Sequence, residues 1–297
     1  MQIYRSLDEV VEVGAIAATT ATIVPDSIVN ADCLEAMKFI PDKSIDCIIC
    51  DLPYGVTALK WDLVIPFDLL WEQYKRIIKP NGAIVLFSSQ PFTSALVMSN
   101  PKWFKYEWIW EKSNGSNFAS VNRMPFKVHE NILVFYNKQP NYNPQKTFNI
   151  SNRVKAVKHS KSDKMGVYGS IKRNELDQYD KTRYPRSVQK IKHEGRNNQF
   201  TDKYNFHPTQ KSCAVYEYLI KTYTLENELI LDNTAGSGTL AIAAMNTNRR
   251  YICIEKDPDY FEVMLNRIEN HDPNAPVTPK KTRKPKAITE GQLSLFG

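Results

Sequence analysis

Two short stretches contain residues whose types and spacing suit group-transfer chemistry. The first is Asp51-Leu52-Pro53-Tyr54, directly after the apolar run IDCIIC. A carboxylate and a backbone carbonyl that accept the N–H bonds of an exocyclic amino group would aim its lone pair and stabilise its developing positive charge. Pro53 would stiffen the loop, and Tyr54 would stack on a base that swings out of its duplex. The alternative is a plain turn, which Asp, Pro and Gly favour.

The second stretch is the glycine-rich segment ELILDNTAGSGTLAIAA. Gly236, Gly238 and Ala241 match the pattern G-x-G-x-x-[GA] between a predicted strand and a predicted helix. Glu255 closes the next predicted strand, 19 residues after Gly236. Glycines allow a ligand to approach the backbone, and a carboxylate at a strand end can bind ribose hydroxyls. The pattern indicates an adenosine-containing cofactor, either NAD or S-adenosylmethionine.

Asp232 favours S-adenosylmethionine over NAD. A carboxylate at the end of the first strand would repel a pyrophosphate and attract an ammonium and a sulfonium. The alternative is that Asp232 only caps the loop that follows it.

Strands that alternate with helices must position these residues. The pattern predicts an α/β fold with a doubly wound, mostly parallel sheet. A helix of about three turns is expected before Pro41, and two further strands could form a hairpin. The other predicted strands span 45–51, 83–89, 228–232 and 251–255, the hairpin strands 105–113 and 129–137, and the helices 67–78, 213–224, 239–248 and 258–270.

Composition excludes several classes of protein. The longest uncharged stretch, VGAIAATTATIV, is short for a membrane span, and acidic residues precede it where a signal peptide needs positive charge. A cytoplasmic location is therefore expected. Cys47 and Cys50 form a CxxC, but strand geometry points them to opposite faces, so we expect buried apolar residues and no metal site.

The positive charge is concentrated in one segment. The net charge is +7, and residues 151–211 contain 15 Lys and Arg against 6 Asp and Glu, a balance of 15 − 6 = +9. Tyrosines and phenylalanines are interleaved with these charges, which suits binding to nucleic acid. The alternative is a solvated surface insertion.

Together these residues resemble the motifs of amino-methylating DNA methyltransferases, whose catalytic tetrapeptide has the form (Asp/Asn/Ser)-Pro-Pro-(Tyr/Phe). DLPY resembles that tetrapeptide, and HPTQKS resembles the signature His-Pro-Thr-Gln-Lys-Pro. LDNTAGSGTLAIAA resembles Leu-Asp-Pro-Phe-x-Gly-Ser-Gly-Thr-Thr. The catalytic motif precedes the cofactor motif, as in the β group of the family, and the similarity covers most of residues 28–268.

The resemblance implies transfer of a methyl group from S-adenosylmethionine to adenine N6 of a flipped-out base in duplex DNA. It also implies a Rossmann-like, seven-stranded sheet, a bacterial or phage-encoded protein associated with the nucleoid, and a place in restriction-modification. The catalytic residues would be Asp51, Leu52, Pro53 and Tyr54. The cofactor would contact Asp32 near its adenine, Thr209 and Lys211 near its methionine end, and Asp51, Asp232, Thr234, Gly236, Gly238, Thr239 and Glu255.

The sequence departs from the family pattern at three places. Leu52 replaces the first proline of the tetrapeptide, although its carbonyl is retained. Asn233 and Thr234 stand where Pro-Phe is usual, and Ser212 replaces the last proline of the signature.

The motif order implies how the chain is organised. Asp51 and Asp232 would end neighbouring parallel strands, which would bring methyl donor and acceptor together at the switch point of the sheet. The expected segments are an N-terminal extension (1–27), a catalytic half (28–139), a target-recognition insert (140–206), a cofactor-binding half (207–270) and a flexible basic tail (271–297).

The tail ends in an apolar peptide after a basic stretch. QLSLF resembles the pentapeptide with which bacterial polymerases and repair proteins bind the replication sliding clamp. Its residues are Gln292, Leu293, Ser294, Leu295 and Phe296. The alternatives are a tail that folds back onto the domain and a chance match.

Other functions remain open at this point. The alternative most similar to adenine methylation is methylation of cytosine N4, although in this family Asp at position 51 favours adenine. An inactive, clamp-associated DNA-binding protein would follow if Leu52 marked a decayed site, and an RNA substrate is a further alternative. An NAD-dependent oxidoreductase would leave DLPYG and the basic insert without a role.

Overall fold

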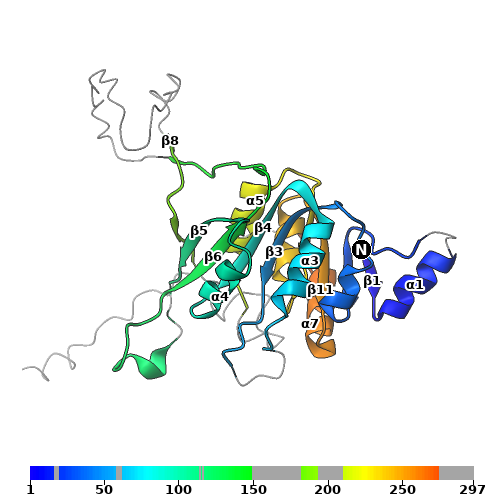
Figure 1. Cartoon of the computed structure of the whole chain (residues 1–297), viewed down its shortest axis with the longest axis horizontal. Helices are drawn as coiled ribbons and strands as arrows, with labels where there is room; N and C mark the ends of the chain where they lie inside the picture. Colours follow the sequence, from blue (N-terminus) through cyan, green and yellow to red (C-terminus); the bar gives the residue numbers. More distant parts are fainter. Residues whose placement is uncertain are drawn as a thin grey trace, which may run out of the picture.

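The fold is built on a nine-stranded sheet. Figure 1 shows this sheet with β5 and β6 towards one side and β1 on the other. The computed structural model describes residues 1–16, 20–57, 62–113, 115, 117–148, 182–192 and 210–273. The strand order is β1-β2-β11-β10-β3-β4-β6-β5-β9. The strands are β1 (Gln2–Tyr4), β2 (Ser27–Asn30), β3 (Ile45–Asp51), β4 (Ile78–Ser88), β5 (Phe104–Glu111), β6 (His129–Phe135), β9 (Val188–Lys190), β10 (Leu229–Asp232) and β11 (Arg250–Glu255), and β7 (Thr147–Phe148) with β8 (Thr182–Arg183) forms a separate pair.

The sheet is mostly parallel. Within the described residues, only β6 runs against its neighbours β4 and β5. The predicted α/β class is confirmed. The sheet has two strands beyond the seven expected, because β1 from the N-terminal segment extends one edge and β9 extends the other.

Helices cover both faces of the sheet. One face carries α2 (Cys33–Met37), α3 (Phe67–Ile77) and α4 (Phe92–Ser99). The other carries α5 (Cys213–Tyr223), α6 (Thr239–Asn246) and α7 (Pro258–Glu269), while α1 (Leu7–Ile16) lies beside β1. The prediction of three turns for α2 was wrong. After Met37 the chain tightens into three-residue turns, in which Phe39 N bonds Ala36 O, and Pro41 disfavours further helix.

Each face has its own apolar core, and the two cysteines of the CxxC divide between them. Cys47 packs with the core under α5, α6 and α7, and Cys50 packs with the core under α2, α3 and α4. Both are fully buried. The prediction that Cys47 and Cys50 are buried on opposite faces of the strand is confirmed. No cluster of metal-ligating side chains occurs among the described residues.

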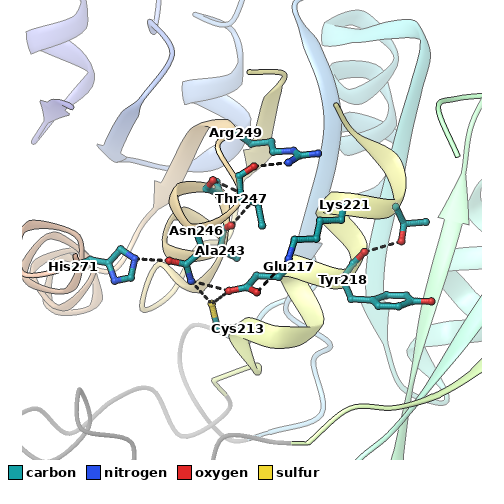
Figure 2. Close-up of polar contacts among 11 residues, drawn as sticks. Cys213, Glu217, Tyr218, Lys221, Ala243, Asn246, Thr247, Arg249 and His271 are labelled. Carbon is teal, nitrogen blue, oxygen red and sulfur yellow. Dashed lines mark hydrogen bonds and ion pairs between the residues drawn. The ribbon is translucent and has the colours of Figure 1, made fainter. Parts of the chain in front are cut away.

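Polar contacts link α5, α6 and the segment after α7 (Figure 2). Asn246 at the end of α6 donates a hydrogen bond to Glu217 of α5 at 2.7 Å, and His271 Nε2 lies 2.7 Å from Asn246 Oδ1. Arg249 Nε donates to the hydroxyl of Thr224 at 3.1 Å. These contacts fix the C-terminal end of α6. The N-terminal end of the helix directly follows the glycine-rich loop.

The two strands that end in the expected carboxylates are neighbours. In β3 and β10, Cys47 pairs with Ile230 and Ile48 pairs with Leu231, in parallel. Asp51 and Asp232 therefore end adjacent strands at the same edge, as the motif order predicted. None of the described helices combines the length and the apolar character needed to cross a membrane.

Candidate active site

The expected catalytic tetrapeptide begins at the carboxyl end of β3. Asp51 Oδ1 accepts a hydrogen bond from the Tyr54 hydroxyl at 2.7 Å, and Asp51 Oδ2 lies 2.7 Å from the Lys211 ammonium. Burial raises the pKa of Asp51, and the charge of Lys211 opposes this shift. The Tyr54 ring stacks on Phe92 at a centroid distance of 5.0 Å, and the Lys211 ammonium lies 5.7 Å from the Tyr54 ring centroid.

Lys211 belongs to a row of alternating buried charges. Its ammonium lies 3.2 Å from Glu130 Oε2, and Lys112 pairs with the other oxygen of Glu130. Lys211 and Glu130 are 8% exposed each, so both charges are desolvated. Burial alone would lower the pKa of Lys211, but the charges of Asp51 and Glu130 raise this pKa above its usual value. The ammonium is therefore charged and is shared between two carboxylates.

The loop after the tetrapeptide is wrapped around Asp62. The Asp62 carboxylate accepts the backbone N–H groups of Tyr54 at 2.7 Å, Gly55 at 2.8 Å, Val56 at 2.9 Å and Thr57 at 2.7 Å. Burial alone would raise the pKa of Asp62, but hydrogen bonds from Thr57, Gly55 and Val56 lower it. These bonds fix the backbone that presents Tyr54.

The glycine-rich loop lies beside the tetrapeptide. The hydroxyl of Thr234 donates to the Asp51 carbonyl at 3.0 Å, so the loop after β10 is bonded directly to the end of β3. Asn233, which stands where the family has proline, is buried and accepts a hydrogen bond from the Tyr74 hydroxyl at 2.6 Å. The two residues that depart from the Pro-Phe pattern therefore make polar links inside the protein.

Glu255 is held at the end of β11 by the same loop. Its two oxygens accept backbone N–H groups from Gly236 at 2.7 Å and Asp257 at 2.8 Å. Burial raises the pKa of Glu255. Gly236 and Gly238 have φ values of 52° and 75°, where glycine is favoured. A Cβ on Gly238 would lie 2.6 Å from Met264 Cγ, so this glycine lets the loop pack closely on α7.

The remaining expected carboxylates have different surroundings. Asp232 is 1% exposed and accepts the N–H of Thr234 at 3.1 Å, which is the capping alternative. Burial raises the pKa of Asp232 to about 8. Asp32 caps α2 by accepting the N–H of Leu34 at 3.0 Å, and its other oxygen lies 3.1 Å from the Lys256 ammonium.

One cavity of about 980 Å³ joins the two stretches. Ligand pockets usually measure about 300–1,000 Å³, so this one has room for a nucleoside-sized cofactor and a base together. Asp232 and Gly238 do not line it, and Thr209 and the tail peptide Gln292–Phe296 lie outside the described residues. The expected residues that line it are Asp32, Asp51, Leu52, Pro53, Tyr54, Lys211, Thr234, Gly236, Thr239 and Glu255.

Several residues of the site were not found from the sequence. Glu130, Lys112 and Asp62 line the cavity or hold its walls. A signal existed for Glu130, which is a single acid in the apolar run ENILVF, and for Asp62, which is a single acid between apolar residues shortly after the tetrapeptide. Neither pattern identifies its partner, because the contacts join distant segments.

The chain is similar to DNA methyltransferases along most of its length. A family model described as DNA methylase matches residues 45–266. DNA adenine methyltransferase YhdJ of Escherichia coli (strain K12) is 26% identical over 255 residues, which cover 82% of each chain. Type II methyltransferase M.HpaI of Haemophilus parainfluenzae is 26% identical over 256 residues, which cover 82% of this chain and 74% of the relative.

Solved structures show the same architecture. The complex of M1.HpyAVI with SAM superposes with a TM-score of 0.54 at 25% identity, and the match covers 81% of this chain and 98% of that chain. The cytosine-N4-specific PvuII DNA methyltransferase gives a TM-score of 0.61 at 16% identity, and the match covers 85% and 90% of the two chains. The second likeness concerns the fold alone.

Proposed function

Because the chain belongs to the DNA methylase family and is an S-adenosylmethionine-dependent DNA methyltransferase, we propose that its target is the N6 amino group of adenine. The observation that carries this proposal is that one cavity is lined both by Asp51 at the end of β3 and by the glycine-rich loop after β10. A methyl donor held by that loop and a base held by the tetrapeptide would meet at the switch point of the sheet.

The residues of the cavity fit the cofactor. Glu255 and Asp32 both line the cavity. Carboxylates at these positions can accept hydrogen bonds from ribose hydroxyls and attract the positive charge of the cofactor. Gly236 in its left-handed conformation keeps the backbone open to a ligand. When bound, S-adenosylmethionine supplies an electrophilic methyl group on a sulfonium.

Asp51 and Leu52 would prepare the amino group. The Asp51 carboxylate and the Leu52 carbonyl accept its two N–H bonds, which localises the lone pair on nitrogen. With the methyl donor bound, the nitrogen would form its bond to the methyl carbon as the carbon–sulfur bond breaks, and the proton released from the methylated nitrogen would pass to solvent. A carboxylate beside that nitrogen stabilises its positive charge during transfer.

Lys211 must give way before the amino group reaches Asp51. Its ammonium occupies Asp51 Oδ2 and would repel the charge that develops on the nitrogen. Glu130 offers the ammonium a second carboxylate at 3.2 Å. We therefore assign Glu130 as the positioning residue that receives Lys211 when the base enters. Lys112 pairs with the other oxygen of Glu130 and holds that carboxylate in place.

The choice of adenine is supported by Asp at position 51 and by the similarity to YhdJ, which is named an adenine methyltransferase. The test is to incubate the protein with methyl-labelled S-adenosylmethionine and mixed-sequence duplex DNA, then to identify the labelled nucleoside and map its sequence context. N6-methyladenine is expected. Labelled N4-methylcytosine would overturn the choice of base, and label absent from DNA would overturn the activity.

The catalytic assignment is tested separately. Asp51→Ala should abolish turnover and largely spare binding of S-adenosylmethionine measured by calorimetry, because the cofactor keeps Glu255 and the glycine-rich loop. Turnover by Asp51→Ala at the rate of the unaltered protein would refute the assigned role.

The basic insert, residues 140–206, would read the DNA sequence. Lys and Arg in this segment would contact phosphates and set the register of the protein on the duplex. Of this segment, residues 140–148 and 182–192 are described, and Val188–Lys190 pairs with β5 at the edge of the sheet. The boundaries of the five expected segments remain a proposal.

The terminal peptide Gln292–Phe296 is proposed to bind a sliding clamp, from its sequence alone. A tethered docking peptide would raise the local concentration of the enzyme on newly copied DNA. Deletion of residues 292–297 should remove clamp binding in a pull-down and leave methylation of short oligonucleotides unchanged. Unaltered clamp binding by the deletion variant would refute this.

A further inference from the structure

The loop between β5 and β6 presents apolar side chains to solvent. Phe118 is 81% exposed, Met124 53%, Phe126 46% and Val121 43%. We call the loop segment that carries these four exposed side chains the β5–β6 tip. Isolated exposed apolar residues are ordinary, but a group of them on one projecting loop indicates a binding surface.

The loop is built to hold this surface outward. The side chain of Asn117 accepts the backbone N–H of Lys127 at 2.7 Å and donates to the Pro125 carbonyl at 3.0 Å, so it ties both arms of the loop together. The 3₁₀ turn Phe118–Ser120 continues with a bond from Met124 N to Ser120 O at 3.0 Å. The exposure of Phe118 is therefore a property of a hydrogen-bonded turn.

The β5–β6 tip stands at the mouth of the active-site cavity. Gly115 and Lys127, in the two arms of the loop, line the cavity, and Lys127 donates a hydrogen bond to Ser89 at the end of β4. The start of β6 pairs with the carboxyl end of β4, since Asn131 lies opposite Ser88. Figure 1 shows the loop projecting from this edge of the sheet.

The charge of the loop selects its partner. Residues 113–128 contain Arg123 and Lys127 and no Asp or Glu. A surface that joins exposed apolar side chains to positive charge suits a duplex, whose phosphates attract the cations and whose opened base steps accept an apolar wedge.

We propose that the β5–β6 tip inserts Phe118 into the DNA at the target base pair and fills the space that the extruded base leaves. The inference rests on the proposed function, because it concerns the same cavity and requires a flipped base. An inserted ring offsets the stacking lost on extrusion and slows return of the base to the helix.

The test compares Phe118→Ala with Leu225→Ala as a matched control. Leu225 is 51% exposed and precedes the amino end of β10. It therefore lies away from the carboxyl ends of the strands, where the cavity is. Each variant is assayed on a matched duplex at the mapped sequence and on a duplex with an abasic site opposite the target. On matched DNA, Phe118→Ala should lower kcat/KM about tenfold or more, which corresponds to about 1.4 kcal/mol.

On the abasic duplex that loss should shrink to about threefold or less, because the target is already unpaired. Phe118→Trp should retain activity on both duplexes, and Leu225→Ala should match the unaltered protein. An equal loss by Phe118→Ala on both duplexes, or no loss on either, would overturn the wedge. Methylation of neither duplex by the unaltered protein would overturn the proposed function instead.

A second measurement detects the wedge directly. With 2-aminopurine at the target position, binding of the unaltered protein should raise the fluorescence of the unstacked base. Phe118→Ala should bind with a smaller rise. An undiminished rise would overturn the proposal, as would binding of the tip to a protein partner with no effect of Phe118→Ala on DNA.

Discussion

At Asp51, burial and a neighbouring ammonium shift the pKa in opposite directions. Burial disfavours the charged carboxylate, and Lys211 at 2.7 Å favours it, with a net rise. Only the ionised carboxylate both accepts an N–H bond of the amino group and stabilises the positive charge that develops on its nitrogen. Activity should therefore be lost as the pH falls through the raised pKa of Asp51.

Lys211→Met should move this acid limb to higher pH. Without the ammonium, burial alone governs Asp51 and raises its pKa further, so a higher pH is needed to ionise it. The measurement is kcat/KM from about pH 5 to pH 9. Lys79→Met is the control, because Lys79 pairs with Asp46 at the start of β3, away from the cavity. An acid limb at the same pH in Lys211→Met and the unaltered protein would contradict the role of Lys211.

Asp62→Ala should loosen the loop that carries Tyr54. Four backbone N–H groups lose a charged acceptor, and each such bond contributes about 1.5–3 kcal/mol. We expect faster amide hydrogen exchange at residues 54–57 and a fall in kcat of about tenfold or more. Asp62→Asn keeps one acceptor and should lie between the two. Protection of residues 54–57 that is unchanged in Asp62→Ala would exclude this role.

The sequence identified residues whose chemistry is carried by local motifs, and missed those whose role depends on distant contacts. Asp51, Tyr54 and Glu255 were predicted because each follows an apolar strand or a glycine loop. The bond between Asp51 and Lys211, and the bridge from Lys211 to Glu130, join three separate segments. A single sequence contains no signal for such pairings.

Among the elements, the turn from β10 into α6 depends most strongly on one residue. Gly238→Ala should destabilise the fold by about 2–5 kcal/mol. A non-glycine residue at φ 75° costs about 1–2 kcal/mol, and overpacking against Met264 costs about 1–3 kcal/mol. Urea unfolding measures the loss.

Gly55→Ala separates these two contributions. Gly55 has a similar φ of 67°, but its added Cβ meets the half-exposed side chain of Val64, which can move. Its cost should be confined to about 1–2 kcal/mol. Equal losses in Gly238→Ala and Gly55→Ala would show that packing on Met264 contributes nothing.

Most of the predicted strands and helices match the structure to within about two residues at each end, but the start of β4, the length of α2 and the cap contacts do not. The apolar runs of β3, β10 and β11 are continuous, and the predicted last residue of each strand is also its last residue in the structure. The length of α2 depends on the turns before Pro41, and the capping role of Asp232 depends on the loop conformation. These are choices between conformations of similar energy, which periodicity does not decide.

At the scale of the whole molecule, the N-terminal segment is part of the core. β1 pairs with β2, and Tyr4, Val10 and Ile23 are 0–2% exposed. Deletion of residues 1–24 should lower the free energy of unfolding by about 5 kcal/mol, since each fully buried apolar side chain contributes about 1.5–3 kcal/mol. Arg5→Ala is the control and should leave the urea midpoint unchanged, because its pair with Glu262 is exposed. A deletion variant as stable as the full chain would contradict this.

The pairing of β3 with β10 also means that β3 is synthesised well before the strand it pairs with. Asp51 leaves the exit tunnel 183 residues before Thr234, the residue that bonds to it. At a synthesis rate of about 5–20 residues per second, about 10–40 s pass between the emergence of β3 and the emergence of β10. During that time an apolar strand edge is open to other nascent chains and to chaperones. A stalled chain that ends before Leu229 will therefore contain the whole tetrapeptide and have no pocket in which to use it.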